Sequence, residues 1–183
     1  TKRNIEKQLE EHQNIDGVRK LVFNRGAVDF LNLVGQLRFQ QRWAQTQRIP
    51  ETSVAGHMLI VAVLSYILSL QMNACEKRRY NNFFGGLFHD MPEVLTRDII
   101  SPVKNSVGGL GSLIKTIEEM QMEEVLLPLL PVSWRSEIRY CTENEFTDRI
   151  IIDGKVLEFS SDKITELYND ERFSPIDGSI IEF

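Results

Sequence analysis

The sequence is poor in cysteine and in long apolar segments. Its two cysteines, Cys75 and Cys141, lie far apart without CxxC or zinc-type spacing. They indicate neither a disulfide framework nor a zinc finger, and they suit a reducing cytoplasm. The most apolar stretch, residues 58–70, is too short to span a bilayer. No basic leader followed by an apolar segment begins the chain. We therefore expect a cytoplasmic protein that does not enter the membrane.

An excess of basic charge is also missing. The chain has 21 Lys and Arg against 26 Asp and Glu, and its net charge is −5. This balance argues against a general nucleic-acid-binding surface. With 183 residues, 42% of them hydrophobic and 26% charged, the composition is that of one globular domain. Residue 1 is Thr and the chain ends on an apolar run, which leaves open whether it is a piece of a longer protein.

Apolar periodicity predicts an all-α domain of six or seven helices. Residues 54–76 are expected to form a long, mostly buried helix that Thr52 or Ser53 caps. Gly85 and Gly86 would let a neighbouring helix approach closely. A short strand at 149–152 is too brief to rely on. The other helices are expected over 2–13, 27–43, 81–95, 112–126, 134–146 and 155–169, with Leu113, Ile117, Met120 and Val125 as core positions.

Residues with metal-binding side chains cluster around one dipeptide. His89 and Asp90 are adjacent, and both can reach one metal ion if the helix ends or loosens there. Such nitrogen and oxygen donors suit Mn, Fe, Co, Ni, Zn or Mg. Glu93 lies three residues after Asp90 and would share its helical face, where a carboxylate can accept a proton from a metal-bound water. His57, in the first turn of the long helix, can supply a second imidazole.

Four sequence blocks follow one another in an informative order: RW (42–43), SVAGH (53–57), HDMPEVLTRDIISPVK (89–104) and SSDKI (160–164). In this order they resemble the HD-domain superfamily of metal-dependent phosphohydrolases, and most closely its subgroup of 5'-deoxynucleotidase-like proteins. The resemblance spans roughly residues 38–170. It implies a helical bundle with a divalent metal site at its centre.

The resemblance also implies roles for individual residues. The metal ligands would be His57, His89, Asp90 and Asp162, and Glu93 would position or deprotonate the attacking water. Asp90 would also count, with Glu93, among the catalytic residues. Arg42 would hold the substrate phosphate and Lys104 could contact it. Trp43 would pack near the sugar and Asp98 would face the sugar hydroxyl. A phosphomonoester carries about two negative charges, which a metal and a guanidinium suit.

Each of these roles has an ordinary structural alternative. Arg42 and Lys104 can be solvated surface cations, and Trp43 can be a core anchor at a helix end. A single histidine such as His57 is more often a hydrogen-bonded core residue than a ligand. Glu93 and Asp98 can be solvated acids. Asp148 and Asp153 compete with Asp162 as the last ligand, because periodicity does not select Asp162.

The sequence thus predicts an N-terminal helical extension at 1–25, an HD phosphohydrolase domain at 26–172 and a tail at 173–183. The function hypothesis is metal-dependent hydrolysis of nucleoside 5'-monophosphates, favouring deoxynucleotides. One alternative is an HD-fold hydrolase of another ester, such as a phosphodiester or a signalling nucleotide. Another is a non-catalytic metal- or nucleotide-binding regulatory domain. Homodimerisation is compatible with the resemblance, but no heptad seam indicates it.

Overall fold

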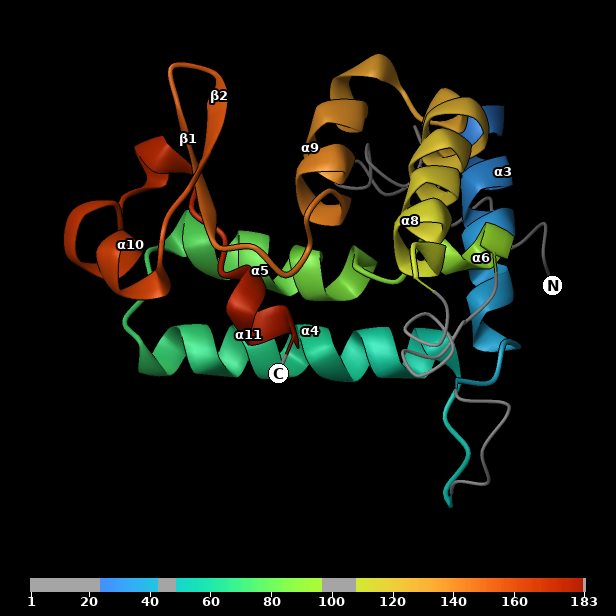
Figure 1. Ribbon diagram of the computed structural model, residues 1–183, viewed down its shortest axis with the longest axis horizontal. Helices are drawn as coiled ribbons and strands as arrows, with labels where there is room; N and C mark the ends of the chain where they lie inside the picture. Colours follow the sequence, from blue (N-terminus) through green and yellow to red (C-terminus); the bar gives the residue numbers. More distant parts are fainter. Residues whose placement is uncertain (1–23, 43–48, 97–107, 183) are drawn as a thin grey trace, which may run out of the picture.

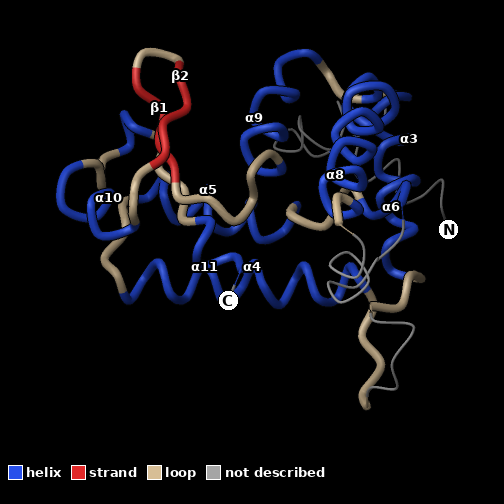
Figure 2. The backbone as a smooth tube through the Cα atoms, in the orientation of Figure 1, coloured by secondary structure: helices blue, strands red, loops and turns tan. Residues whose placement is uncertain are grey.

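The computed structural model describes residues 24–42, 49–96 and 108–182, and these are mostly helical, as predicted. The only strands among the described residues form one small hairpin (Figures 1 and 2). In chain order the elements are α3 (Arg25–Val34), α4 (Val54–Gln71), α5 (Glu76–Phe88), α6 (Glu93–Thr96), α8 (Leu110–Gln121), α9 (Val132–Thr142), β1 (Arg149–Ile152), β2 (Lys155–Glu158), α10 (Ser161–Leu167) and α11 (Gly178–Glu182).

Two antiparallel helices, α4 and α5, form the base of the domain (Figure 1). The Oγ of Ser53 caps α4 by accepting a hydrogen bond from the N–H of Gly56 at 3.1 Å. A methyl group on Gly86 would lie 2.9 Å from the Cα of Ala62. Glycine is therefore needed where α5 crosses α4. Both the cap and the close approach of the helices confirm the sequence predictions.

The main hydrophobic core lies at the end of this pair where α4 begins and α5 ends. It joins side chains from α3, the 3-10 helix Gly35–Arg38, α4, the turn after α5 and the segment after α8: Phe30, Leu37, Val54, Met58, Met91, Met122, Leu126, Leu127 and Leu130. Burial of these apolar groups is the main stabilising term for this end of the domain. The core therefore fixes the first turn of α4 against the last turn of α5.

The expectation that residues 54–76 are mostly buried is wrong. Helix α4 packs on α5 with one face, and its other face leaves large apolar side chains exposed: Leu59, Ile60, Val63, Leu64, Ile67 and Leu70. The sequence gives no sign of this, because apolar residues occur on every face of the helix. By length and composition alone, α4 could also cross a membrane, although such a helix is weak evidence for one. The apolar helix thus has 18 residues and extends beyond the stretch 58–70 that stands out in the sequence.

Helix α8 buries a different stripe from the one expected. The predicted core positions Leu113, Ile117, Met120 and Val125 are exposed. The buried residues of this segment are Ile114, Met122 and Leu126. A π-helical turn at Met122–Leu126 follows α8 and changes the helical spacing. Of the four predicted positions only Val125 lies in this turn, where regular helical spacing selects the wrong face; Leu113, Ile117 and Met120 precede it, and the turn does not explain their exposure.

The helix expected over 155–169 is also wrong in its first part. Residues 155–158 form β2, which pairs antiparallel with β1 so that Ile152 lies opposite Lys155. The two-residue turn between the strands is Asp153-Gly154, and both residues have positive φ, at 50° and 74°. This is the backbone conformation that tight hairpins require. Only Ser161–Leu167 is helical, as α10.

A buried polar network attaches the C-terminal residues to α5. Arg78 and Asp177 are both fully buried and pair through two hydrogen bonds, Nε to Oδ2 at 2.7 Å and Nη2 to Oδ1 at 2.6 Å. The Nδ2 of Asn82 donates to the same carboxylate at 2.7 Å. Helix α11 follows and contacts α4 and α5. The packed domain therefore includes residues that the sequence assigned to a tail at 173–183.

Candidate metal centre

Two histidines meet where α4 begins and α5 ends. His57 lies in the first turn of α4, and its N–H donates to the carbonyl of Ser53 at 2.9 Å. His89 follows the last residue of α5, Phe88. Because the two helices are antiparallel, these ends are adjacent, and the imidazole centroids lie 5.2 Å apart. The long-range pairing of His57 with His89 is therefore a direct consequence of the helix pair.

Asp90 completes a group of three converging donor atoms. Its Oδ2 lies 3.1 Å from the Nε2 of His89 and 3.5 Å from the Nε2 of His57. The two Nε2 atoms are 3.3 Å apart. Among the described residues, these three are the ones whose donor atoms gather closely enough to hold a metal ion. The structure thus brings together three of the four ligands that the family resemblance implied.

The carbonyl oxygen of Gly86 determines which nitrogen of His89 carries the proton. The Nδ1 of His89 lies 2.8 Å from that oxygen. Since a carbonyl can only accept, Nδ1 must donate, so Nε2 is the nitrogen that faces Asp90: it donates to that carboxylate when the ring is protonated and can ligate a metal when the ring is neutral. Histidines that ligate a metal through one ring nitrogen typically donate the N–H of the other ring nitrogen in this way.

Asp90 is held in the ionised form that metal binding requires. Burial by itself raises the pKa of this carboxyl. The hydrogen bond from His89 and the charges of His89, Arg42 and His57 outweigh burial and lower the pKa to about 2. A carboxylate that is already deprotonated at neutral pH can bind a cation without first losing a proton.

A short backbone pairing positions Arg42 beside the three converging donors. The N–H of Arg42 donates to the carbonyl of Thr52 at 2.8 Å, and Gln41 and Ser53 form an isolated antiparallel bridge. Gln41 and Arg42 are thereby fixed beside the first turn of α4. From there the Nη1 of Arg42 donates to the Oδ2 of Asp90. Arg42 is therefore part of the site, and the alternative of an isolated surface cation is not supported.

The donor set fits a divalent metal. Two imidazole nitrogens and one carboxylate oxygen form a combination used for Mn, Fe, Co, Ni and Zn, and it does not choose sharply among them. His89 is buried, and its ring is oriented by Gly86. This preorganisation reduces the side-chain entropy that is lost on binding.

Glu93 begins α6, one turn after Asp90. Its N–H donates to the carbonyl of Asp90 at 3.1 Å, and only 7% of the residue is exposed. The turn between them is anchored by Met91, whose side chain is fully buried in the core. Glu93 is therefore not a solvated surface acid, which was the ordinary alternative to its catalytic role.

The structure does not bring Asp162 to this group. Asp162 is exposed in the first turn of α10. The neighbouring Ser161 bonds to Arg78 on α5, eleven residues before His89, which is about 16 Å along a helix. The two competing acids also lie elsewhere: Asp153 is in the hairpin turn, and Asp148 accepts a hydrogen bond from the N–H of Ser179. None of the three belongs to the converging donor set.

Three further predicted site residues, Trp43, Asp98 and Lys104, lie outside the described residues. Sequence reasoning also missed one side chain, Phe146, whose ring centroid lies 6.3 Å from that of His89. Nothing in the pattern around Phe146 distinguishes it from a core phenylalanine.

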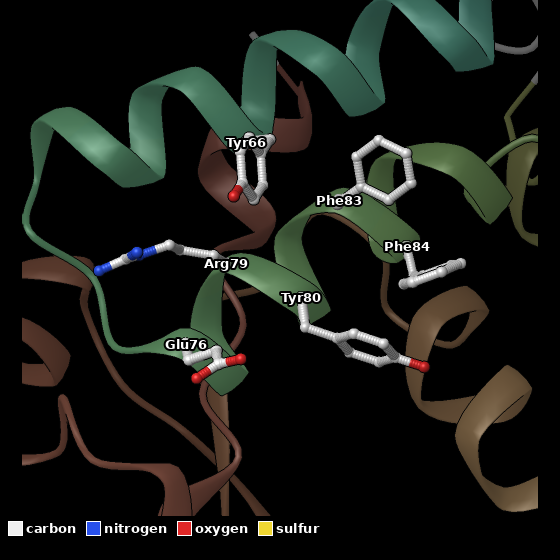
Figure 3. A pocket seen from close by; sticks show the side chains of 6 residues that line it. All are labelled: Tyr66, Glu76, Arg79, Tyr80, Phe83 and Phe84. Atoms are coloured by element: carbon white, nitrogen blue, oxygen red, sulfur yellow. The ribbon is translucent and has the colours of Figure 1, made fainter.

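A cavity among the described residues lies in a different part of the fold. A cavity of about 610 Å³ lies beside α4 and α5 and is lined by four aromatic side chains with one acid and one arginine (Figure 3): Tyr66, Tyr80, Phe83, Phe84, Glu76 and Arg79. None of the three converging donors lines it. Donor chemistry, and not the volume of this cavity, therefore locates the candidate metal centre.

Comparison with known proteins agrees with this geometry. A family model described as HD domain matches residues 34–182. A protein named 5'-deoxynucleotidase from Vibrio atlanticus is 29% identical over 111 residues, which are 59% of this chain and 57% of the relative. A 5'-deoxynucleotidase from Photobacterium profundum is 28% identical with the same coverage.

A third relative carries a different name. The 4'-phosphooxetanocin A phosphatase of Priestia megaterium is 32% identical over 79 residues, which are 42% of this chain and 41% of the relative. The chain therefore spans less than two thirds of the length of the curated relatives it matches. The family model, in contrast, covers most of the chain and includes His57, His89, Asp90 and Glu93. The chain belongs to the HD-domain family.

Proposed function

We propose that this chain is a metal-dependent phosphohydrolase that acts on nucleoside 5'-monophosphates and favours deoxynucleotides. The observation that carries the proposal is the convergence of the Nε2 atoms of His57 and His89 with the Oδ2 of Asp90. The names of the relatives support the ester class, since two are called 5'-deoxynucleotidase and one is called a phosphatase. In the reaction, water supplies an oxygen to phosphorus and the bond to the 5'-oxygen breaks.

His57, His89 and Asp90 would hold the metal ion. When bound, a divalent ion neutralises phosphate charge and makes water a better nucleophile. Arg42 lies against Asp90 and carries a guanidinium with five N–H donors. One fork of such donors matches two phosphate oxygens. In the proposed role, Arg42 would bind and orient the phosphate beside the metal ligands.

Glu93 would accept the proton of the attacking water. Its position one turn after Asp90, in a largely buried environment, suits a general base. The base does not need to contact the metal, because it acts on the water that is positioned there. Trp43 and Asp98 remain the proposed contacts to the sugar, and Lys104 a proposed contact to phosphate, on the strength of the family resemblance.

The proposal is tested by phosphate release from paired deoxy- and ribonucleoside 5'-monophosphates. Metal-stripped protein receives Mn, Co, Mg or Zn in separate assays. We expect metal-dependent release that is faster with the deoxy form. Hydrolysis of phosphodiesters but not of monophosphates would show that the substrate is a diester and not a nucleoside monophosphate. No release from any ester, by protein that binds metal normally, would favour a regulatory domain.

The ligand set is tested separately by metal titration of two variants. Asp90→Ala should lose metal binding, because it removes the only carboxylate among the three converging donors of the described residues. Asp162→Ala is the matched control, and we expect it to retain metal because Asp162 is exposed on α10. If Asp162→Ala folds normally but loses the metal, Asp162 is a metal ligand, as the family resemblance implied.

A further inference from the structure

Phe146 presents a partly exposed aromatic ring beside the candidate metal centre. Its ring centroid lies 6.3 Å from that of His89, with the two planes inclined by 60°. The residue is 43% exposed, although its neighbour His89 is buried. Among the described residues, Phe146 is the aromatic side chain with a ring contact to one of the three converging ligands. A molecule whose phosphate binds at the candidate metal centre would therefore lie next to the ring of Phe146.

The loop that carries Phe146 is held by a buried arginine. Arg149 is 2% exposed, and its Nη1 donates to the carbonyls of Asn144 at 2.8 Å and Thr147 at 2.7 Å. Its Nη2 donates to the carbonyl of Tyr140. The accepting carbonyls belong to residues before and after Phe146 in the chain. The backbone of the loop is thus fixed from within the domain, while the ring of Phe146 remains partly exposed.

Helix α11 packs against the backbone of the same loop. A methyl group on Gly178 would lie 2.1 Å from the nitrogen of Thr147 and 2.3 Å from the carbonyl carbon of Phe146. Only glycine fits this contact without moving the loop. Ile176, two residues earlier, pairs with Arg149 through two backbone hydrogen bonds of 2.9 and 3.0 Å. Two independent contacts therefore hold the Phe146 loop close to His89.

We propose that Phe146 is a wall on which the nucleobase of the substrate stacks, and this inference rests on the proposed function. The ring has no charge and no hydrogen-bonding atom, so it can bind neither the phosphate nor the sugar hydroxyls with any strength. The base is the planar part of a nucleotide with an apolar face, and one sugar separates it from the phosphate. Aromatic side chains bind bases by stacking, with little dependence on base identity.

The consequence for specificity is that this chain recognises a base without reading its edge at Phe146. Stacking on one side chain contributes about 1–3 kcal/mol per base. Loss of the ring should therefore weaken binding of all nucleotides by a similar factor, on the order of tenfold. A phosphate ion, which has no base, should bind equally well with or without the ring.

The inference is tested by calorimetric titration of metal-loaded protein with deoxyadenosine monophosphate, thymidine monophosphate and inorganic phosphate. For Phe146→Ala we expect about tenfold weaker binding of both nucleotides and unchanged binding of phosphate. Phe146→Trp should restore nucleotide binding, which a merely structural role would not predict. Phe159→Ala is the control, because the Phe159 ring contacts Tyr168 and Lys163 and none of the converging ligands.

A second variant tests the positioning of the loop. Gly178→Ala must move the Phe146–Thr147 backbone, and it should weaken nucleotide binding while phosphate binding is retained. Equal weakening of nucleotide and phosphate in Phe146→Ala would overturn the inference, as would unchanged nucleotide binding. These readouts do not require turnover. If the wild-type protein binds nucleotides through Phe146 but releases no phosphate from them, the proposed function fails and the stacking wall stands.

Discussion

Replacement of Arg78 by Ala should destabilise the domain strongly. Arg78 and Asp177 are fully buried and share two short hydrogen bonds. The guanidinium also donates to Thr165 at 3.1 Å and Ser161 at 3.2 Å. Arg78→Ala would leave the carboxylate of Asp177 buried without its cation. Removal of one partner of a buried ion pair costs about 3–5 kcal/mol.

This cost is a large share of the stability of an ordinary domain, which is about 5–15 kcal/mol. For a chain of this length, each kcal/mol lowers Tm by about 2–4 °C, so Arg78→Ala should lower Tm by about 6–20 °C. Circular dichroism during thermal unfolding measures the change. Metal binding at low temperature should persist, because Arg78 precedes His89 by eleven residues of α5 and its cap.

The neighbouring lysine provides the control. Lys77 also lies on α5, and its Nζ pairs with the Oε1 of Glu137 at 3.2 Å, but both side chains are partly exposed. Exposed pairs contribute at most about 1 kcal/mol, so Lys77→Ala should shift Tm by only a few degrees. A change of unfolding free energy below about 1 kcal/mol in Arg78→Ala would refute the reasoning from burial.

Two further predictions concern the metal centre and a buried thiol. Glu93→Gln should bind Co as the wild type does but release phosphate about 10²–10⁴-fold more slowly; unchanged turnover would remove Glu93 from its role as the base. Burial raises the pKa of the Cys141 thiol to about 12, although the charge of Arg149 lowers it. In native protein a maleimide should therefore label Cys75 well before Cys141, and labelling at equal rates would contradict the burial. Stability should also fall as pH rises above about 8.5, because the unfolded thiol ionises there while the folded thiol stays neutral.

Local signals in the sequence predicted several features of the fold. Ser53 caps α4, which depends only on its near neighbours in the chain. Gly86 lies where α5 crosses α4, which a glycine inside a helical segment signals although its contact, Ala62, is on the other helix. The hairpin was missed although its signal was present. Asp153-Gly154, between two apolar segments, is a typical two-residue hairpin turn.

Burial was predicted less well than helicity. The stripe Leu113, Ile117 and Met120 has helical spacing, yet it is exposed, and Ile114 on the adjacent face is buried. Helical periodicity indicates that one face of a helix is apolar, but packing against distant segments decides which face is buried. The same limit applies to α4, where apolar residues occur all around the helix and the pattern cannot distinguish a buried face from an exposed one.

The difference between the ligands that were located and the one that was not follows from chain connectivity. His89 and Asp90 are adjacent, so any fold that ends α5 at Phe88 keeps them together. His57 joins them because only residues 72–75 connect α4 to α5, and so short a connection makes the two helices antiparallel neighbours. Asp162 would have to return to the site across more than seventy residues that include a hairpin. Its position depends on the Arg78 network, which sequence spacing does not reveal, and this network holds α10 against the opposite end of α5.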